Sequence, residues 1–496
     1  MSDSTPDAQT LLRRLDEAME RIDKLEAENA RLRKRVKELE GVEQENVRLR
    51  KRVQRLEHQL HQDSSNSHRP PSTDDPWADD DDDDDGRVML DFGKQRSQGA
   101  QPGHQGHHRQ LADADEVDKF VEVRPDECDG CGHRLTGEDI APWRHQIWDI
   151  EVSKTLVEYR MHRLECDRCS ATQRAELPEG VAHSNFGDRL ASWVGYLSGR
   201  FDLSKRDVEQ LVEEGFGIPI SLGSVCALER RAQRALAPAW REAVELLDAS
   251  EVLWVDETGW FQSNERNWMW VAVGDDNTEV TVFRIADSRS RQALRQLVSA
   301  DFDGIVTSDR YGAYNGRAPK KRQICWQHLV RDFRGLVARD GPGAKAAGQM
   351  LLIAQLIFWT LGRIEQGKYP PEKLRRRIDE AWAPAVNIIL ERGDEPDDAP
   401  AIFGNLKKRQ EALWNVAFHD DVEPTNNRAE RAVRPAVIKR KLSFGTQSGD
   451  GSRFIERMLT VCESLRRQSR AVLDFIADSI VARRTGRIPP ALARPG

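Results

Sequence analysis

We expect the sequence to lack the two features that would direct it into or across a membrane. These are a signal peptide at its start and an apolar run that crosses a bilayer. Cysteine is scarce, with 7 in 496 residues. In a reducing compartment these cysteines are metal ligands, core residues or free thiols rather than disulfides. We therefore expect a cytoplasmic protein without a membrane partner, built from three or four units because one compact domain cannot hold this length.

An even spread of charge is also absent. The net charge of -8 argues at first against a nucleic-acid partner. However, residues 79–85 are seven consecutive aspartates, whereas residues 426–496 carry 15 Lys or Arg against 6 Asp or Glu. Because a partner responds to the local field, the C-terminal part stays a candidate phosphate-binding surface. One hypothesis is that the aspartates compete with DNA for this basic part.

Residues 1–62 are predicted to form a coiled coil that dimerises the chain. Apolar residues recur every seven positions, for example at Leu15, Ile22 and Val36. Asn29 takes an a-like position, which favours a parallel, in-register dimer. Residues 63–111 contain the aspartates and stretches rich in Ser, Pro, Gly and His, with too few apolar residues for a core. They are predicted to be a disordered linker.

Residues 112–182 contain two CxxC pairs that predict a structural zinc site. Cys128 and Cys131 form one pair and Cys166 and Cys169 the other, and four thiolates are the complement of a tetrahedral Zn²⁺ ion. A redox dithiol is the alternative. Alternating apolar residues at 146–152, followed by residues 155–161, predict a hairpin between the pairs. Three histidines are close enough in sequence to replace a cysteine: His133, His145 and His162.

Residues 183–248 are predicted to be helical, with a possible helix-turn-helix for DNA binding. Ser204 is suited to cap a helix that starts at Lys205, and Ser221 a second helix that runs to about Ala235. The second helix carries three arginines, at positions 230, 231 and 234. A helix, a turn and a basic helix are typical of a DNA reader, although a plain helical bundle has the same pattern.

Residues 249–328 change to a strand pattern in which two strands lead into an aspartate. An apolar run at 252–255 leads into Asp256, and a short strand at 304–308 leads into Asp309. Between them we expect strands at 268–273 and 280–285 and a helix at 291–299. A central sheet would expose the two aspartates side by side, although an aspartate in a turn is usually only a turn former or a helix cap.

The segment at residues 425–435 places Glu430 among three arginines on a predicted short helix. One interpretation is a capping box, with Asn427 as the N-cap and Glu430 as its partner. The other is phosphodiester chemistry, because a carboxylate can hold a metal ion while guanidinium groups hold phosphate. With Asp256 and Asp309, Glu430 completes the three carboxylates that two-metal phosphoryl transfer requires. Mg²⁺ suits such a site because it accepts oxygen ligands.

Four motifs together resemble the transposases of the insertion sequence 66 family. They are Asp-Glu-Thr-Gly at 256–259, Ser-Asp-Arg-Tyr-Gly-Ala-Tyr at 308–314, Cys-Trp-Gln-His-Leu at 325–329, and Asn-Asn-Arg-Ala-Glu-Arg at 426–431 with Arg-Pro at 434–435. The similarity covers nearly the whole chain. It implies a multidomain α/β protein with an RNase H-like catalytic domain, in which a mixed sheet is flanked by helices. The domain would occupy residues 249–328 and 425–482, with an all-helical insertion at 329–424 and a tail at 483–496.

The resemblance implies that Asp256, Asp309 and Glu430 are the triad of a DDE transposase, holding two Mg²⁺ ions for which Mn²⁺ can substitute. Glu257 is an alternative ligand, although its side chain should face the other side of the sheet. Cys325 and His328 resemble a CxxH pair of such enzymes, with ordinary packing as the alternative.

The implied reaction is cut-and-join chemistry on double-stranded DNA, at the element's ends and at a target. Two alternatives stay open: a catalytically silent DNA-binding regulator, and an RNase H-like nuclease without strand transfer. We expect self-association through the coiled coil, small accessory proteins of the same element, and a bacterial cytoplasm with the nucleoid as the place of action. Six basic residues are expected to hold flanking phosphates: Arg428, Arg431, Arg434, Lys439, Arg440 and Lys441.

Overall fold

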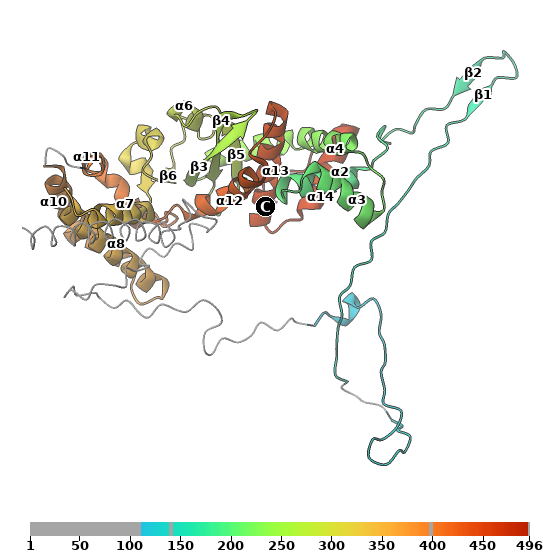
Figure 1. Cartoon of the computed structure of the whole chain (residues 1–496), viewed down its shortest axis with the longest axis horizontal. Helices are drawn as coiled ribbons and strands as arrows, with labels where there is room; N and C mark the ends of the chain where they lie inside the picture. The colour runs from blue at the N-terminus through green and yellow to red at the C-terminus, as the bar shows by residue number, and fades with distance from the viewer. Residues whose placement is uncertain (1–110, 138–141, 396–399, 495–496) are drawn as a thin grey trace, which may run out of the picture. The chain divides into compact units, whose positions relative to one another are not determined.

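The computed structural model describes residues 111–137, 142–395 and 400–494. The predicted coiled coil over residues 1–62 and the aspartates at 79–85 lie outside the described residues and stay predictions. The described part is a mixed α/β structure (Figure 1).

A five-stranded mixed sheet lies at its centre, in the order β5-β4-β3-β6-β7. The strands expected at 268–273 and 280–285 are confirmed as β4 and β5, which form an antiparallel meander with β3, and β6 and β7 run parallel to β3. A mixed sheet with flanking helices fits the RNase H-like expectation. The strands are β3 (Val252–Gln262), β4 (Glu265–Val273), β5 (Thr281–Ala286), β6 (Ile305–Ser308) and β7 (Arg322–Ile324).

Strand β3 is longer than predicted. It does not end at residue 255 but continues to Gln262, where it pairs with Glu265 of β4. The two-residue turn between them is Ser263-Asn264, with φ of 51° and 66°. Such a turn matches the twist of the two strands and so prolongs their pairing. As a result, Asp256 lies inside a strand and not just beyond its end.

Helix α13 (Gly449–Arg467) covers the free edge of β5 with three side chains spaced four residues apart. Glu456, Thr460 and Ser464 accept hydrogen bonds from the backbone N–H groups of residues 285, 283 and 281, at 2.6, 3.0 and 2.9 Å. Four helical residues rise about 6 Å and two strand residues about 6.8 Å, so the two spacings match. The helix thereby satisfies an edge that would otherwise invite pairing with another chain.

The two helices predicted around the turn at 217–221 are confirmed. Helix α3 (Lys205–Phe216) is capped by Ser204, and helix α4 (Leu222–Ala235) by Ser221. Gly217 ends α3 in the left-handed conformation that glycine tolerates best. Both helices contribute to one hydrophobic core with the sheet, joined by α2 (Asp188–Arg200), α5 (Ala237–Asp248), α12 (Asn427–Ser443), α13 and α14 (Val472–Thr485).

The predicted helical insertion has its own hydrophobic core. Its elements are α7 (Trp326–Ala338), α8 (Ala344–Glu365), α9 (Glu372–Arg377), a π-helical turn (Ile378–Trp382), α10 (Ala383–Asp394), α11 (Ala401–Lys407), η6 (Gln410–Leu413) and η7 (Asn415–Ala417). Helix α8 corrects the expectation that no run could cross a membrane, because its length and composition would allow it. It nevertheless packs in this second core, where Met350, Ala354 and Ile357 are fully buried.

Shorter elements complete the described chain. They are η2 (Ala114–Glu116), β1 (Arg163–Glu165), β2 (Thr172–Arg174), α6 (Arg291–Arg295), η3 (Gly312–Gly316) and η4 (Pro319–Lys321). The hairpin predicted over residues 146–161 is wrong, since the structure has no strand there. Ile147, Ile150 and Leu156 are 82, 85 and 94 % exposed. Alternating apolar residues favour a strand only where a second layer buries one face.

We expect the α13 contacts to stabilise the sheet measurably. Ser464 is buried and both accepts from and donates to Thr281, whereas the equally buried Ser479 donates only to a carbonyl of its own helix. Ser464→Ala should lower the free energy of unfolding by about 1–3 kcal/mol because it leaves a buried N–H without a partner. Ser479→Ala should lower it by less than about 1 kcal/mol. Guanidinium unfolding followed by tryptophan fluorescence measures both, and equal losses would contradict this role of α13.

Candidate active site

The register of two parallel strands brings Asp256 and Asp309 together. Trp254 of β3 lies opposite Thr307 of β6, and each aspartate follows two residues later. Because side chains alternate along a strand, a shift of two keeps the same face. Asp309 directly follows β6, as predicted, whereas Asp256 lies within β3 and pairs with Val271 of β4.

Glu430 reaches the same place from the first turn of α12, which packs against β3 and β4. Its carboxylate is buried and interacts electrostatically with Asp256. The capping-box interpretation of Asn427 and Glu430 is wrong. The N-cap is Asn426, and its side chain makes no capping hydrogen bond. Its amide Nδ2 instead donates to the carbonyl of Val255, at 3.0 Å.

The electrostatics of this cluster suit a cation. Burial raises the pKa of Asp256 well above its usual value, and the charges of Glu257, Glu430 and Asp309 raise it further, while His328 acts in the opposite direction. Carboxylates held this close repel each other unless a proton or a cation lies between them. Several oxygen donors on one side of a sheet are the ligand set that Mg²⁺ accepts. Among the described residues the oxygens of Asp256, Asp309 and Glu430 do not all lie within 4.8 Å of one another, but carboxylates whose charges act on one another are the kind of donor set that a divalent metal ion accepts.

The carboxylate of Glu257, the alternative ligand, is held by two other side chains. Its carboxylate is buried and accepts hydrogen bonds from the Tyr314 hydroxyl and from Arg289, whose Nε lies 2.6 Å from Oε1. Arg289 also stacks over the ring of Tyr311 at 3.7 Å and lies 3.9 Å from Asp309. The sequence alone did not indicate Arg289 as a residue of this site. Its only signal is that a basic residue follows shortly after the strand β5.

Cys325 and His328 do meet a third ligand-type residue. Among the described residues, they and Glu430 form a group whose ligand atoms all lie within 4.8 Å of one another. His328 Nδ1 is 3.5 Å from Glu430 Oε1. Burial lowers the pKa of His328, but Cys325 and Glu430 outweigh it and raise this pKa to about 10. An imidazolium beside Glu430 favours the ionised carboxylate.

The two CxxC pairs adopt the same local turn. The amide of Gly132 donates to the carbonyl of Cys128 and that of Ser170 to the carbonyl of Cys166, both at 2.8 Å. Hydrogen bonds from backbone N–H groups within each turn lower the pKa of the first cysteine of each pair. Each pair thus has both sulfurs on one tight turn, as a zinc knuckle requires. Within the described residues, the two turns do not form one four-sulfur cluster.

The six basic residues expected to hold phosphates divide into two groups. Arg431, Arg434 and Lys441 are exposed, and spacings of three and seven place them on one face of α12. Lys439 is wrong as a phosphate contact, because it is buried and donates to Ser198 O at 2.7 Å and Asp202 Oδ1 at 3.0 Å.

Arg428 and Arg440 also hold the fold. Arg428 pairs with Asp276 and Glu423 at 2.5 and 2.6 Å and lies over the ring of Trp254. Arg440 donates to Thr258 Oγ1 and Gly259 O of β3, at 2.9 and 2.8 Å. These contacts tie both guanidinium groups to neighbouring parts of the protein.

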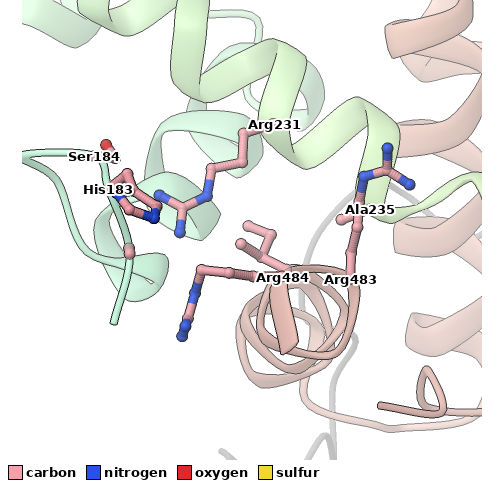
Figure 2. Close-up of a pocket in the computed structure, with 8 residues that line it drawn as sticks. His183, Ser184, Arg231, Ala235, Arg483 and Arg484 are labelled. Carbon is pink, nitrogen blue, oxygen red and sulfur yellow. The ribbon is translucent and has the colours of Figure 1, made fainter. Parts of the chain in front are cut away.

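A pocket of about 250 Å³ lies between residues 182–184, α4 and α14, and contains none of the triad (Figure 2). Arg231 and Arg484 both pair with Asp188, the latter at 2.7 Å, and Arg231 also donates to Phe186 O at 3.0 Å. These guanidinium groups hold the first turn of α2 against two other helices. We therefore assign this pocket a structural role.

Comparison with known proteins gives two family matches. The family described as "Transposase IS66 family" matches residues 183–453, which is more than half of the chain, and a family of unknown function, DUF6444, matches residues 3–110. Two uncharacterized proteins of Sinorhizobium fredii are similar. Protein y4qI is 25% identical over 236 residues, 43% of this chain and 43% of its own length. Protein y4jO is 23% identical over 207 residues, 39% of this chain and 61% of its own length. Both matches span less than two thirds of the relative.

We expect the CxxC turns to bind about one zinc ion per chain. Cys128→Ser and Cys166→Ser should each reduce the zinc content to near zero, because three remaining ligands hold the ion far more weakly. Cys226→Ser, at a half-buried free thiol of α4, is the matched control and should keep the zinc. Elemental analysis of the purified full chain measures this, and zinc retained by both variants would rule out a shared four-cysteine site.

Proposed function

The chain belongs to the IS66 transposase family, and we propose that it cleaves the ends of its insertion sequence and joins the freed 3'-hydroxyls to target DNA. The convergence of Asp256, Asp309 and Glu430 carries this proposal. The strand register puts Asp256 and Asp309 on one face of a mixed sheet, and the charges of Asp309 and of Glu430, from a helix, both act on Asp256. Their negative charges repel one another, and bound divalent metal ions would offset this repulsion.

Asp256, Asp309 and Glu430 would hold two Mg²⁺ ions, for which Mn²⁺ can substitute. When bound, such ions make a water or 3'-hydroxyl a better nucleophile and neutralise charge on the leaving oxygen. The protein fixes the ligands. Asp309 Oδ1 accepts the amide N–H of Tyr311 at 2.9 Å, which orients its carboxylate. His328, with its raised pKa, keeps a proton on its ring and so favours Glu430 as an anion.

The exposed face of α12 is proposed to hold the DNA backbone next to the reacting phosphate. Arg431 directly follows Glu430, and Arg434 and Lys441 continue the same face away from the carboxylates. Such contacts orient DNA without reading its sequence. Helices α3 and α4, whose Arg230 and Arg234 are exposed, are the proposed second contact and the candidate reader of the element's ends.

Assembly is the remaining part of the proposal. The heptad pattern of residues 1–62 supports self-association, which would let two chains act on the two ends of one element. Accessory proteins of the same element and an action at the bacterial nucleoid are proposed on the family resemblance alone.

We expect Asp256→Asn and Glu430→Gln to lower Mg²⁺-dependent cleavage of DNA carrying the element's ends by about a thousandfold or more, because a lost metal ligand removes several kcal/mol of transition-state stabilisation. Binding of the ends should change little. Glu229→Gln is the control, since Glu229 of α4 is also buried but pairs with Lys205 of α3.

Strand transfer is tested separately with pre-cleaved ends and a supercoiled target. Joined product in the wild type supports a transposase, cleavage without joining indicates a nuclease, and end binding without either reaction indicates a regulator. Cleavage retained by either triad variant would overturn the site assignment.

We expect Arg431→Ala and Arg434→Ala to weaken binding to all DNA sequences alike. Each should reduce the slope of log K against log salt by about 1, as the loss of one phosphate contact does. Lys439→Met is the control, because its buried ammonium contacts only protein and its removal should lower stability and leave the salt slope unchanged. Fluorescence anisotropy over a salt series measures the slopes, and a normal slope for both arginine variants would exclude this face of α12.

A further inference from the structure

The N-cap residue of α12 is tied directly to the strand that carries Asp256. Asn426 is fully buried, and its amide Nδ2 donates to the carbonyl of Val255 at 3.0 Å. Val255 is the residue before Asp256, and Asn426 begins the helix whose first turn holds Glu430. One side chain therefore fixes the distance between the backbone of the first carboxylate and the helix of the third.

Cys325 connects the same residue to the second aspartate. Its buried Sγ accepts the backbone N–H of Asn426 at 3.2 Å. Its own amide donates to the carbonyl of Ser308 at 2.9 Å, and Ser308 is the residue before Asp309. Asn426 and Cys325 thus link the backbones beside all three carboxylates through three hydrogen bonds.

The chemistry of Asn426 indicates that this link is its task. An asparagine at an N-cap usually places its side-chain oxygen on the helix's own N–H groups. Here the side chain makes no such bond, and its Oδ1 has no hydrogen-bond partner among the described residues. Burying an amide with an unpaired oxygen is unfavourable, so the donor contact to Val255 is the interaction that its position serves.

We propose that Asn426 and Cys325 are positioning residues, which hold Glu430 at the correct distance from Asp256 and Asp309 for metal binding. This inference rests on the proposed function. Groups that orient metal ligands typically change metal affinity or activity by about 10–100-fold when they are mutated. The effect should appear in metal binding and turnover and not in the affinity for DNA.

The test uses the full chain and two readouts. The first is the Mn²⁺ concentration that gives half of the maximal metal-induced rise in Tm, measured without DNA. The second is the rate of Mg²⁺-dependent cleavage at saturating DNA, together with the KM for DNA. Asn426→Ser keeps a good N-cap residue but is too short to reach Val255. Cys325→Ala removes the acceptor for the Asn426 amide.

Both variants should need about 10–100-fold more Mn²⁺ and cleave more slowly by a similar factor, with an unchanged KM. Asn415→Ala and Cys462→Ala are matched controls. Asn415 is a buried asparagine of the insertion that donates to the backbone carbonyls of Pro319 and Arg322, and Cys462 is a buried cysteine of α13. They should lower Tm but keep the wild-type dependence on Mn²⁺.

A wild-type Mn²⁺ dependence in folded Asn426→Ser and Cys325→Ala would overturn the positioning role. If Asn426→Ser does not fold, the Cys325→Ser variant tests the positioning role instead. The serine Oγ lies closer to its Cβ than the cysteine Sγ does, so the acceptor moves away from the Asn426 amide. Glu430→Gln separates the two hypotheses. If it keeps both the metal-induced shift and cleavage, the proposed function fails; if it loses both while the positioning variants behave as wild type, only the positioning role fails.

Discussion

The carboxylates of Asp256, Asp309 and Glu430 repel one another, and the surrounding structure has to hold them in place against this repulsion. Like charges that are partly or fully buried would separate or take up protons unless the backbone holds them. Strand register fixes two of them, because β3 and β6 run parallel and each aspartate lies two residues beyond a paired residue. A helix supplies the third, and the positive end of its dipole favours an anion in the first turn.

The basic residues around this cluster form two groups, one that faces into the protein and one that faces outward. Inward-facing cations hold the framework: Arg289 engages Glu257, Arg428 joins the start of α12 to Asp276, and Lys439 joins its last turns to Asp202. Breaking any one of these would leave a partly buried charge without its partner, which is more damaging than losing a surface pair. Arg431 and Arg434 face outward from the same helix. One helix therefore separates folding contacts from contacts offered to a phosphate backbone.

The sequence predicted the elements better than it predicted the contacts. The aspartate after β6, the meander and the capped helices α3 and α4 follow from period, composition and turn residues, which act locally. It did not show that Asp256 lies within a strand, because a Ser-Asn turn that begins seven residues later prolongs β3. It left open a capping box at Asn427 because the spacing fits one, whereas the N-cap is Asn426, whose side chain donates to a strand residue 171 positions away. The prediction that Lys439 contacts phosphate was also wrong because of a residue distant in sequence, since α2 determines the environment of its side chain.

The long separation between Asp309 and Glu430 in sequence has little effect on their separation in space, because the insertion begins and ends at one place. The amide of Trp326, at the start of α7, donates to the carbonyl of Pro424 at 2.9 Å, and its indole donates to Leu413 O at 2.9 Å. Closing a long loop costs only slightly more than closing a short one, about 0.6 kcal/mol for each doubling. With its ends joined and its own core formed, the insertion leaves the entry to α12 where Asn426 can meet Val255. The carboxylate geometry therefore depends on this junction and not on the length of chain that lies beyond it.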